Sequence, residues 1–178
     1  MSHLVDSAPS LLDRLRQHAI KQLARREHSR AELARKLLAI ASDSPDVAED
    51  IATVLDQLEQ SGLLSDTRYV EAYLRSHAAR FGAARLRNTL RTKGIAAELI
   101  ESALAQMAAI DESGEEMNNE MARAKAVWWS KFGSRPRDAR EWARQARFLQ
   151  SRGFASEVIC KVIKAEGNGV TDGPGQNG

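Results

Sequence analysis

The stretch LRNTLRTKGIAAELIESAL, which spans Leu86–Leu104, decides the fold because its pattern returns later in the chain. Its apolar residues recur at intervals of three and four, the spacing that places them on one face of an α-helix. Residues 149–163, LQSRGFASEVICKVI, repeat this pattern at a constant offset, with Gly153 where the first copy has Gly94. A pattern that returns at a fixed spacing is typical of a repeat protein.

The pattern extends in both directions from this stretch. Residues 33–37 align with 86–90, residues 47–51 align with 95–99 after an insertion near 42–45, and residues 81–82 align with 132–133. Each unit is therefore expected to hold three helices. The predicted units are 1–64, which includes an N-terminal extension, 65–110 and 111–166, and the Gly-rich residues 167–178 are expected to be disordered. We predict an all-α, elongated tandem array of three three-helix repeats.

Composition agrees with a helical protein. The chain has 178 residues, of which 43% are hydrophobic and 28% charged, as in folded proteins and unlike disordered ones. Ala and Leu dominate the apolar set, aromatic residues make up only 5%, and no segment alternates apolar with polar residues as a strand does. No apolar run is long enough to span a membrane, and no signal peptide is visible, so a cytoplasmic protein is expected.

Local signals mark the predicted helix ends. Ser10–Asp13, Ser29–Glu32 and Ser113–Glu116 have the spacing of a capping box, in which the serine oxygen accepts an unpaired backbone N–H. Pro45 and Pro136 are expected at helix starts. Five glycines at the ends of periodic runs are expected to cap helices in the left-handed conformation: Gly62, Gly82, Gly94, Gly133 and Gly153.

Residues that carry chemistry are scarce. The sequence has no phosphate-binding Gly-rich loop, no dinucleotide fingerprint and no zinc-protease motif, and its four histidines have no metal-ligand spacing. His77 lies within an apolar stripe and is expected to be a core or interface histidine, and Cys160 is expected to be a buried, inert thiol. We therefore expect no catalytic residue, cofactor, metal or small-molecule substrate, and the chain is predicted not to be an enzyme.

The charge distribution is informative although the net charge is only +2. Residues 111–120 contain five acidic residues and no Lys or Arg, whereas residues 121–152 contain nine Lys or Arg and two acidic residues. Such a strongly basic segment sets a local field that the total charge hides.

One predicted binding surface is an arginine stripe. On a helix over residues 137–149, Arg137, Arg140, Arg144 and Arg147 share one face, and Trp142 and Leu149 lie on the opposite face. A solvated surface is the simplest interpretation. Like charges one turn apart repel, however, so an unbalanced stripe favours binding of a polyanion or an acidic protein. The charge pattern does not distinguish these two ligands.

A second basic cluster lies in the middle repeat, where residues 79–97 contain no acidic residue. The cluster consists of Arg80, Arg85, Arg87, Arg91 and Lys93. The predicted binding residues among them are Arg85, Arg87, Arg91 and Lys93, and Arg152 completes the set in the third repeat. Aromatic residues accompany them. Phe148 lies on the arginine side of its helix as a partner contact or as packing, and one of Trp128 and Trp129 is expected at a unit boundary or a partner surface.

Three segments together resemble the RecX family, bacterial modulators of the RecA recombinase. They are Ser29–Leu37 (SRAELARKL), Leu58–Tyr73 (LEQSGLLSDTRYVEAY) and Phe81–Ile95 (FGAARLRNTLRTKGI), and the resemblance covers about residues 15–165. It implies tandem three-helix repeats and a role in DNA repair, homologous recombination and the SOS response. Such proteins bind the RecA–DNA filament groove and usually suppress ATP hydrolysis, strand exchange and coprotease activity, with no cofactor.

We therefore expect a monomeric regulator of RecA, inhibitory in the usual case, that touches DNA weakly, either directly or through the filament. The alternative is a free-standing DNA-binding regulator whose three-helix units act as helix-turn-helix readers. That alternative predicts sequence-preferring binding to duplex DNA without the recombinase.

Overall fold

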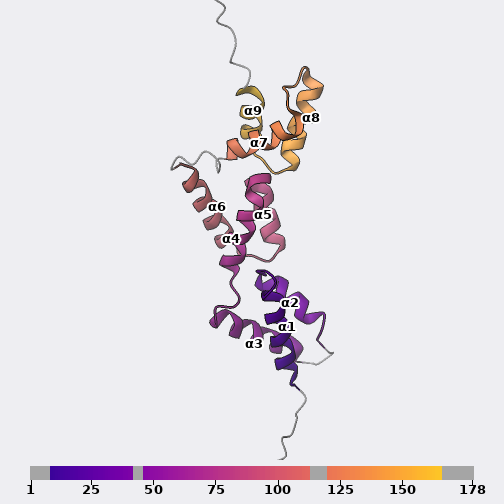
Figure 1. Ribbon diagram of the computed structural model, residues 1–178, viewed down its shortest axis with the longest axis vertical. Coiled ribbons are helices and arrows are strands. Elements are labelled where there is room, and N and C mark those ends of the chain that lie inside the picture. Colours follow the sequence, from indigo (N-terminus) through magenta and orange to yellow (C-terminus); the bar gives the residue numbers. More distant parts are fainter. Residues whose placement is uncertain (1–8, 42–45, 113–119, 166–178) are drawn as a thin grey trace, which may run out of the picture. The chain divides into compact units, whose positions relative to one another are not determined.

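The computed structural model describes residues 9–41, 46–112 and 120–165, and within these ranges it contains helices and no strand. In chain order the elements are α1 (Leu11–Leu23), α2 (Arg30–Leu38), α3 (Val47–Gln60), α4 (Asp66–His77), the 3₁₀ helix η1 (Ala78–Arg80), α5 (Ala83–Thr92), α6 (Ala97–Glu112), α7 (Glu120–Phe132), α8 (Ala139–Ser151) and α9 (Ser156–Ala165) (Figure 1). The all-α prediction is confirmed. Across these helices none is long and apolar enough to cross a membrane. The expected helix starts at Pro45 and Ser113 and the tail 167–178 lie outside the described residues.

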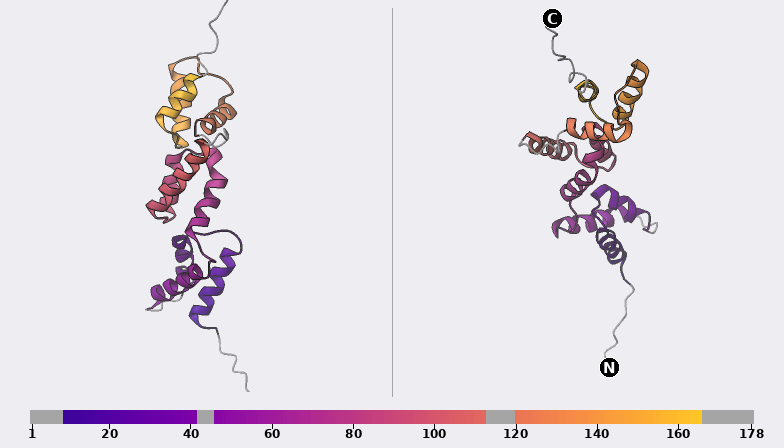
Figure 2. Two further views of the ribbon diagram at one scale, coloured as in Figure 1. Left: turned by 90° about the vertical axis from the view of Figure 1, so that its left-hand side faces the viewer. Right: turned by 45° about the horizontal axis from the view of Figure 1, so that its top comes forward.

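The chain forms two compact units. Unit 1 contains the described residues up to Ala72 together with Arg91–Ala96, and unit 2 contains Tyr73–Leu90 and the described residues from Ala97 onward. In unit 1, α1, α2 and α3 pack against one another, and in unit 2, α7, α8 and α9 do so (Figure 2).

The core of unit 1 comes from the apolar faces that the sequence predicts. Leu15 and Ala19 of α1 are buried against Leu33 and Leu37 of α2 and the apolar face of α3, which includes Leu58. Burying each leucine side chain contributes about 1.5–3 kcal/mol, so this face holds the three helices together.

The caps of α1 and α2 fix where these helices begin. Ser10 and Asp13 form the expected capping box on α1. Ser29 caps α2 by accepting the N–H of Glu32, and its buried hydroxyl donates to the carbonyl of Lys93 at 2.7 Å. The N–H of Arg30 donates to Asp66 Oδ1 at 2.8 Å. The start of α2 is thereby joined to the turn after α5 and to the start of α4.

The core of unit 2 has a polar centre. Trp128 of α7 is fully buried, and its indole N–H donates to the buried side-chain oxygen of Gln145 at 2.7 Å. Gln145 occupies the position in α8 that Leu86 holds in α5, by the offset that aligns Leu90 with Leu149. The neighbouring Trp129 is 51% exposed, so the two tryptophans point to opposite environments as expected.

The prediction that Gly82 is a left-handed helix cap is wrong. Gly62, Gly94, Gly133 and Gly153 adopt positive φ as expected of left-handed helix caps, whereas Gly82 does not. Gly82 is instead buried, and a Cβ atom there would collide with the backbone of Gly153 and Phe154. Its N–H donates to the carbonyl of Arg152 at 3.0 Å. The segment before α5 thus lies directly on the turn between α8 and α9.

Two further predictions are wrong in detail. Pro136 does not begin α8, because Asp138 is the N-cap and accepts the N–H of Glu141 at 2.7 Å. Asp138 has an extended backbone (φ −147°, ψ 174°), so the helix begins after it, and its carboxylate accepts a helical N–H as an N-cap does. Cys160 is half-buried rather than buried, because it borders an open groove between α8 and α9 that Trp142 also lines.

Candidate anion-binding surface

Three arginines of α8 form an exposed row that we call the α8 stripe: Arg140, Arg144 and Arg147. Leu149 and Gln145 are buried on the opposite side of the helix, so core packing fixes which way the stripe faces. The stripe lines a surface hollow of about 450 Å³ together with Asp138 and Glu141. The surface therefore mixes three cations with two carboxylates.

Both carboxylates accept backbone N–H groups at the start of α8. Asp138 accepts the N–H of Glu141, and Glu141 accepts the N–H of Arg137 at 2.9 Å. Arg137 precedes the helix instead of continuing the stripe along it. Within the part of the chain that the structure describes, Arg140, Arg144 and Arg147 make no ion pair, so their guanidinium groups are available to a partner.

Arginine and phenylalanine side chains form a continuous row of ring contacts in unit 2, which we call the Arg–Phe ladder. Its members, in spatial order, are Arg85, Phe81, Arg152, Phe148, Phe132 and Arg144. The guanidinium of Arg85 lies 4.4 Å from the Phe81 ring centre, and that of Arg152 lies 5.7 Å from Phe81 and 5.0 Å from Phe148. The Phe148 and Phe132 rings meet edge-on at 5.3 Å, and Arg144 lies 5.8 Å from Phe132. Stacking on aromatic faces holds these cations in place without neutralising them.

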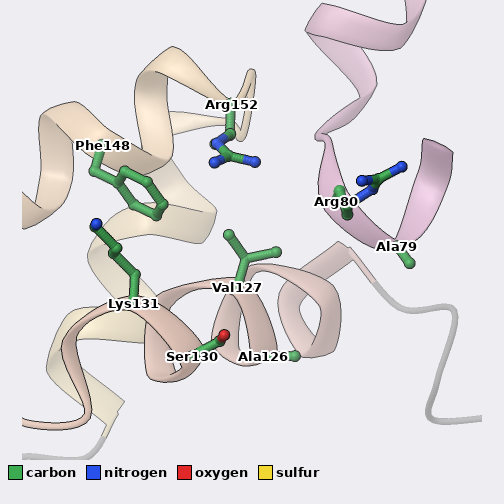
Figure 3. Close-up of a pocket in the computed structure, with 8 residues that line it drawn as sticks. All are labelled: Ala79, Arg80, Ala126, Val127, Ser130, Lys131, Phe148 and Arg152. Carbon is green, nitrogen blue, oxygen red and sulfur yellow. The ribbon is translucent and has the colours of Figure 1, made fainter.

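Beside the ladder lies a cavity of about 360 Å³, which we call the basic hollow. Its cations are Arg80 of η1, Lys131 of α7 and Arg152, which follows α8 (Figure 3). Its remaining lining residues are Ala79, Ala126, Val127, Ser130 and Phe148. The carboxylate of Glu120, from the start of α7, is engaged elsewhere, since it accepts the N–H of Ala83 at 3.0 Å.

The structure brings the predicted residues Arg85, Arg144 and Arg152 into the ladder, and it places others differently. Arg87 is bound by both oxygens of Glu101, at 2.6 and 2.9 Å, and this hydrogen bonding raises the pKa of Arg87. Arg91 and Lys93 belong to unit 1 and not to the surface just described. Lys93 contributes its backbone carbonyl to the Ser29 hydroxyl and is half-buried.

Arg80 belongs to the basic cluster that the sequence indicates but not to the predicted binding residues, and Lys131 belongs to neither. A signal was present, because each residue precedes a Phe-Gly pair, in Arg80-Phe81-Gly82 and Lys131-Phe132-Gly133. The repeat therefore offers a basic residue at the same position in two copies. Only the folding of unit 2 shows that these two positions line one cavity.

No group of His, Cys, Asp and Glu in the described ranges could hold a metal ion. His77 is half-buried, shares a hydrogen bond of 2.9 Å with the carbonyl of Tyr73, and stacks on the Tyr73 ring at 4.2 Å. Its ring is thus fixed by structural contacts, as expected. The surface features that remain are basic and aromatic, and they are suited to binding an anion.

Known proteins resemble this chain both in sequence and in fold. Residues 65–104 match the family model described as RecX, second three-helix domain, and residues 118–163 match the model for the third. A protein named Regulatory protein RecX from Leptothrix cholodnii is 45% identical over 150 residues, which cover 84% of this chain and 87% of that protein. Another of that name, from Ralstonia nicotianae, is 38% identical over 159 residues, which cover 89% and 92%. The crystal structure of RecX from Lactobacillus salivarius matches with a TM-score of 0.67 at 17% identity, covering 87% of this chain and 96% of that one, and this likeness concerns the fold.

Proposed function

The chain belongs to the RecX family of regulatory proteins, and we propose that it regulates the RecA recombinase by binding along the groove of the RecA–DNA filament. Family membership supports the recombinase as the target. We further propose that the protein acts as a cytoplasmic monomer built from three three-helix repeats, with boundaries near residues 64 and 110.

The observation that carries the proposal is the α8 stripe. Arg140 and Arg144 are one helical turn apart, as are Arg144 and Arg147, and each such like-charge pair destabilises an isolated helix by a few tenths of a kcal/mol. Arg140 also lies in the first turn of α8, where the helix dipole disfavours a cation. These unfavourable terms support a binding role, because an acidic partner offsets them.

The composition of the stripe favours a protein surface as its partner. Asp138 and Glu141 line the same hollow, so a phosphate backbone would meet two carboxylates beside the three arginines. A protein surface that carries both signs of charge can match such a pattern, and charge matching contributes specificity and speed of association. We therefore propose that the α8 stripe contacts recombinase subunits.

Occupation of the groove has a direct consequence for activity. A chain that lies in the groove excludes a second DNA and other substrates from it. The expected result is lower strand exchange and coprotease activity, and lower ATP hydrolysis where the bound chain favours filament disassembly.

Charge reversal of the stripe tests this proposal. The variant Arg140→Glu, Arg144→Glu, Arg147→Glu is compared with the matched control Arg14→Glu, Arg25→Glu, Arg75→Glu, which changes three other exposed arginines. RecA ATPase on single-stranded DNA is measured against concentration of each folded protein. We expect the stripe variant to need at least about tenfold more protein for equal inhibition, as for the loss of several charged contacts. Equal inhibition by the stripe variant and the wild type would reject the stripe as the contact.

The same proteins separate this proposal from the free-standing DNA-binding regulator. Filter binding of duplex DNA is measured at two salt concentrations, with and without RecA. Non-specific phosphate contacts weaken steeply with salt. Tight, sequence-preferring binding to duplex DNA without RecA would support the free-standing regulator instead.

A further inference from the structure

We propose that the basic hollow of unit 2 binds a nucleotide, with phosphate groups against the cations Arg80, Lys131 and Arg152 and the nucleoside against Val127 and Phe148. This site is distinct from the α8 stripe, and the proposal does not depend on the proposed function. The ligand chemistry is shared by a free nucleotide and by one nucleotide of a single nucleic-acid strand, and the experiment below separates these two sources.

The charge of the hollow points to an anion. Its three cations come from different elements, and no described carboxylate lines it. Within the described ranges, none of Arg80, Lys131 and Arg152 makes an ion pair. A cavity lined by charges of one sign concentrates counter-ions of the other sign, because its low-dielectric walls focus the field. The hollow differs in this respect from the α8 stripe, which carries two carboxylates.

Arg152 is held in place before any ligand arrives. Its guanidinium contacts the rings of Phe81 and Phe148, and its side chain is half-buried. Its carbonyl accepts the N–H of Gly82, which fixes its backbone against the segment that carries Arg80. An arginine fork ordered in advance loses less conformational entropy when it donates two hydrogen bonds to a phosphate.

The apolar wall of the hollow fits a nucleoside better than a bare phosphate. In Figure 3 the Val127 side chain rises from α7 toward Arg152, and the Lys131 side chain points toward Phe148. Ala79 and Ala126 extend this wall, and the Ser130 side chain adds a hydroxyl group. The volume of about 360 Å³ lies at the lower end of the range of about 300–1,000 Å³ for small-molecule pockets. An aromatic face beside clustered cations is also how proteins hold single-stranded nucleic acid.

Binding of three probes to the full chain tests the proposal: a fluorescent ATP analogue, a labelled 15-nucleotide oligothymidylate and inorganic pyrophosphate as a competitor. The double variant Arg80→Ala, Lys131→Ala removes two cations that line the hollow. Its matched control, Arg75→Ala, Lys161→Ala, removes two other exposed cations of unit 2. The conservative variant Arg152→Lys keeps the charge and removes the planar fork. Circular dichroism confirms that each variant is folded.

We expect the double variant to weaken probe binding at least about tenfold, as for the loss of charge-assisted hydrogen bonds, and the control to change it less than about twofold. For the oligonucleotide, loss of two phosphate contacts lowers the slope of log affinity against log salt by about 1.4. Binding of ATP that pyrophosphate displaces indicates a free nucleotide as the source. Binding of the oligonucleotide without ATP indicates a nucleic-acid strand.

Phe148→Leu in the Arg152→Lys background tests the nucleoside contact separately from the phosphate, because the guanidinium that contacts Phe148 is already absent. Relative to Arg152→Lys, it is expected to weaken ATP or oligonucleotide binding severalfold, because stacking on an aromatic ring is lost, and to leave pyrophosphate competition less affected. No binding of any probe at millimolar concentration, or equal binding by the double variant and the control, would overturn the proposal. Equal weakening of ATP and pyrophosphate when Phe148→Leu is added to Arg152→Lys would overturn the placement of the nucleoside.

Discussion

Replacing Gln145 with leucine removes one half of the buried polar pair in unit 2. Gln145 is 2% exposed and accepts the indole N–H of Trp128, which is 0% exposed, at 2.7 Å. Leucine has a similar volume and stands at the equivalent position of α5, as Leu86. The substitution therefore tests the hydrogen bond with little change in packing volume, and it also removes the longer hydrogen bond, 3.4 Å, that Gln145 Nε2 donates to the Ser134 carbonyl.

The structure sets the size of the effect. Gln145→Leu leaves the buried Trp128 N–H without its acceptor, which costs about 1–3 kcal/mol. Trp128→Phe leaves the Gln145 oxygen without its donor at a similar cost, with a further loss from the smaller ring. The double variant removes both polar groups, so the unpaired-group penalties disappear. We expect it to be less destabilised than the sum of the single variants by about 1–3 kcal/mol.

Urea unfolding followed by tryptophan fluorescence measures this coupling. All three tryptophans, Trp128, Trp129 and Trp142, belong to unit 2, so the signal reports the unfolding of that unit. Gln150→Leu is the matched control, because Gln150 is exposed on the same helix, and its effect is expected within about 0.5 kcal/mol. A double variant whose loss equals the sum of the single losses within about 0.5 kcal/mol would show that Trp128 and Gln145 are not energetically coupled.

Three further predictions concern single residues. Burial lowers the pKa of His28 from its usual value of 6.5, with the charge of Arg26 acting in the same direction. The unfolded chain then binds a proton that the folded chain does not, so the free energy of unfolding is expected to fall as pH drops through about 6.5, and His28→Leu should flatten this dependence between about pH 7.5 and 5.5. Gly82→Ala is expected to lower the melting temperature more than Gly133→Ala, because a Cβ meets backbone at Gly82 and open space at Gly133, where only the positive φ costs about 1–2 kcal/mol. Trp129→Phe should lower the fraction of fluorescence that acrylamide quenches more than Trp142→Phe does, since Trp129 is 51% exposed, Trp142 is half-buried and Trp128 is 0% exposed; unchanged quenching would contradict this placement.

The sequence predicts those parts of the fold that depend on nearby residues. The buried leucines Leu33, Leu37, Leu86 and Leu90 follow from helical periodicity, and the caps at Ser10 and Ser29 follow from serine and an acidic residue three positions apart. The helical glycine caps follow likewise from single residues at the ends of periodic runs.

Features that depend on distant residues were missed or misplaced. From sequence alone a glutamine is expected to be exposed. Gln145 is buried because it accepts a hydrogen bond from Trp128, which lies 17 residues earlier in the chain. The sequence pattern predicts Gly82 to be a helix cap, but glycine is needed there because the backbone of Gly153 lies against it. The same limit applies to the site, since Arg87 is bound to Glu101 on the next helix, and Arg80 and Lys131 meet at one cavity only through the folding of unit 2.

The most direct test of the proposed function is a cryo-electron microscopy map of this chain bound to a RecA filament on single-stranded DNA. We expect the chain to lie in the filament groove with Arg140, Arg144 and Arg147 against acidic side chains of the recombinase. A map in which the chain occupies the groove while these three arginines face solvent would contradict the role of the α8 stripe. A chain bound outside the groove would contradict the proposed mode of regulation.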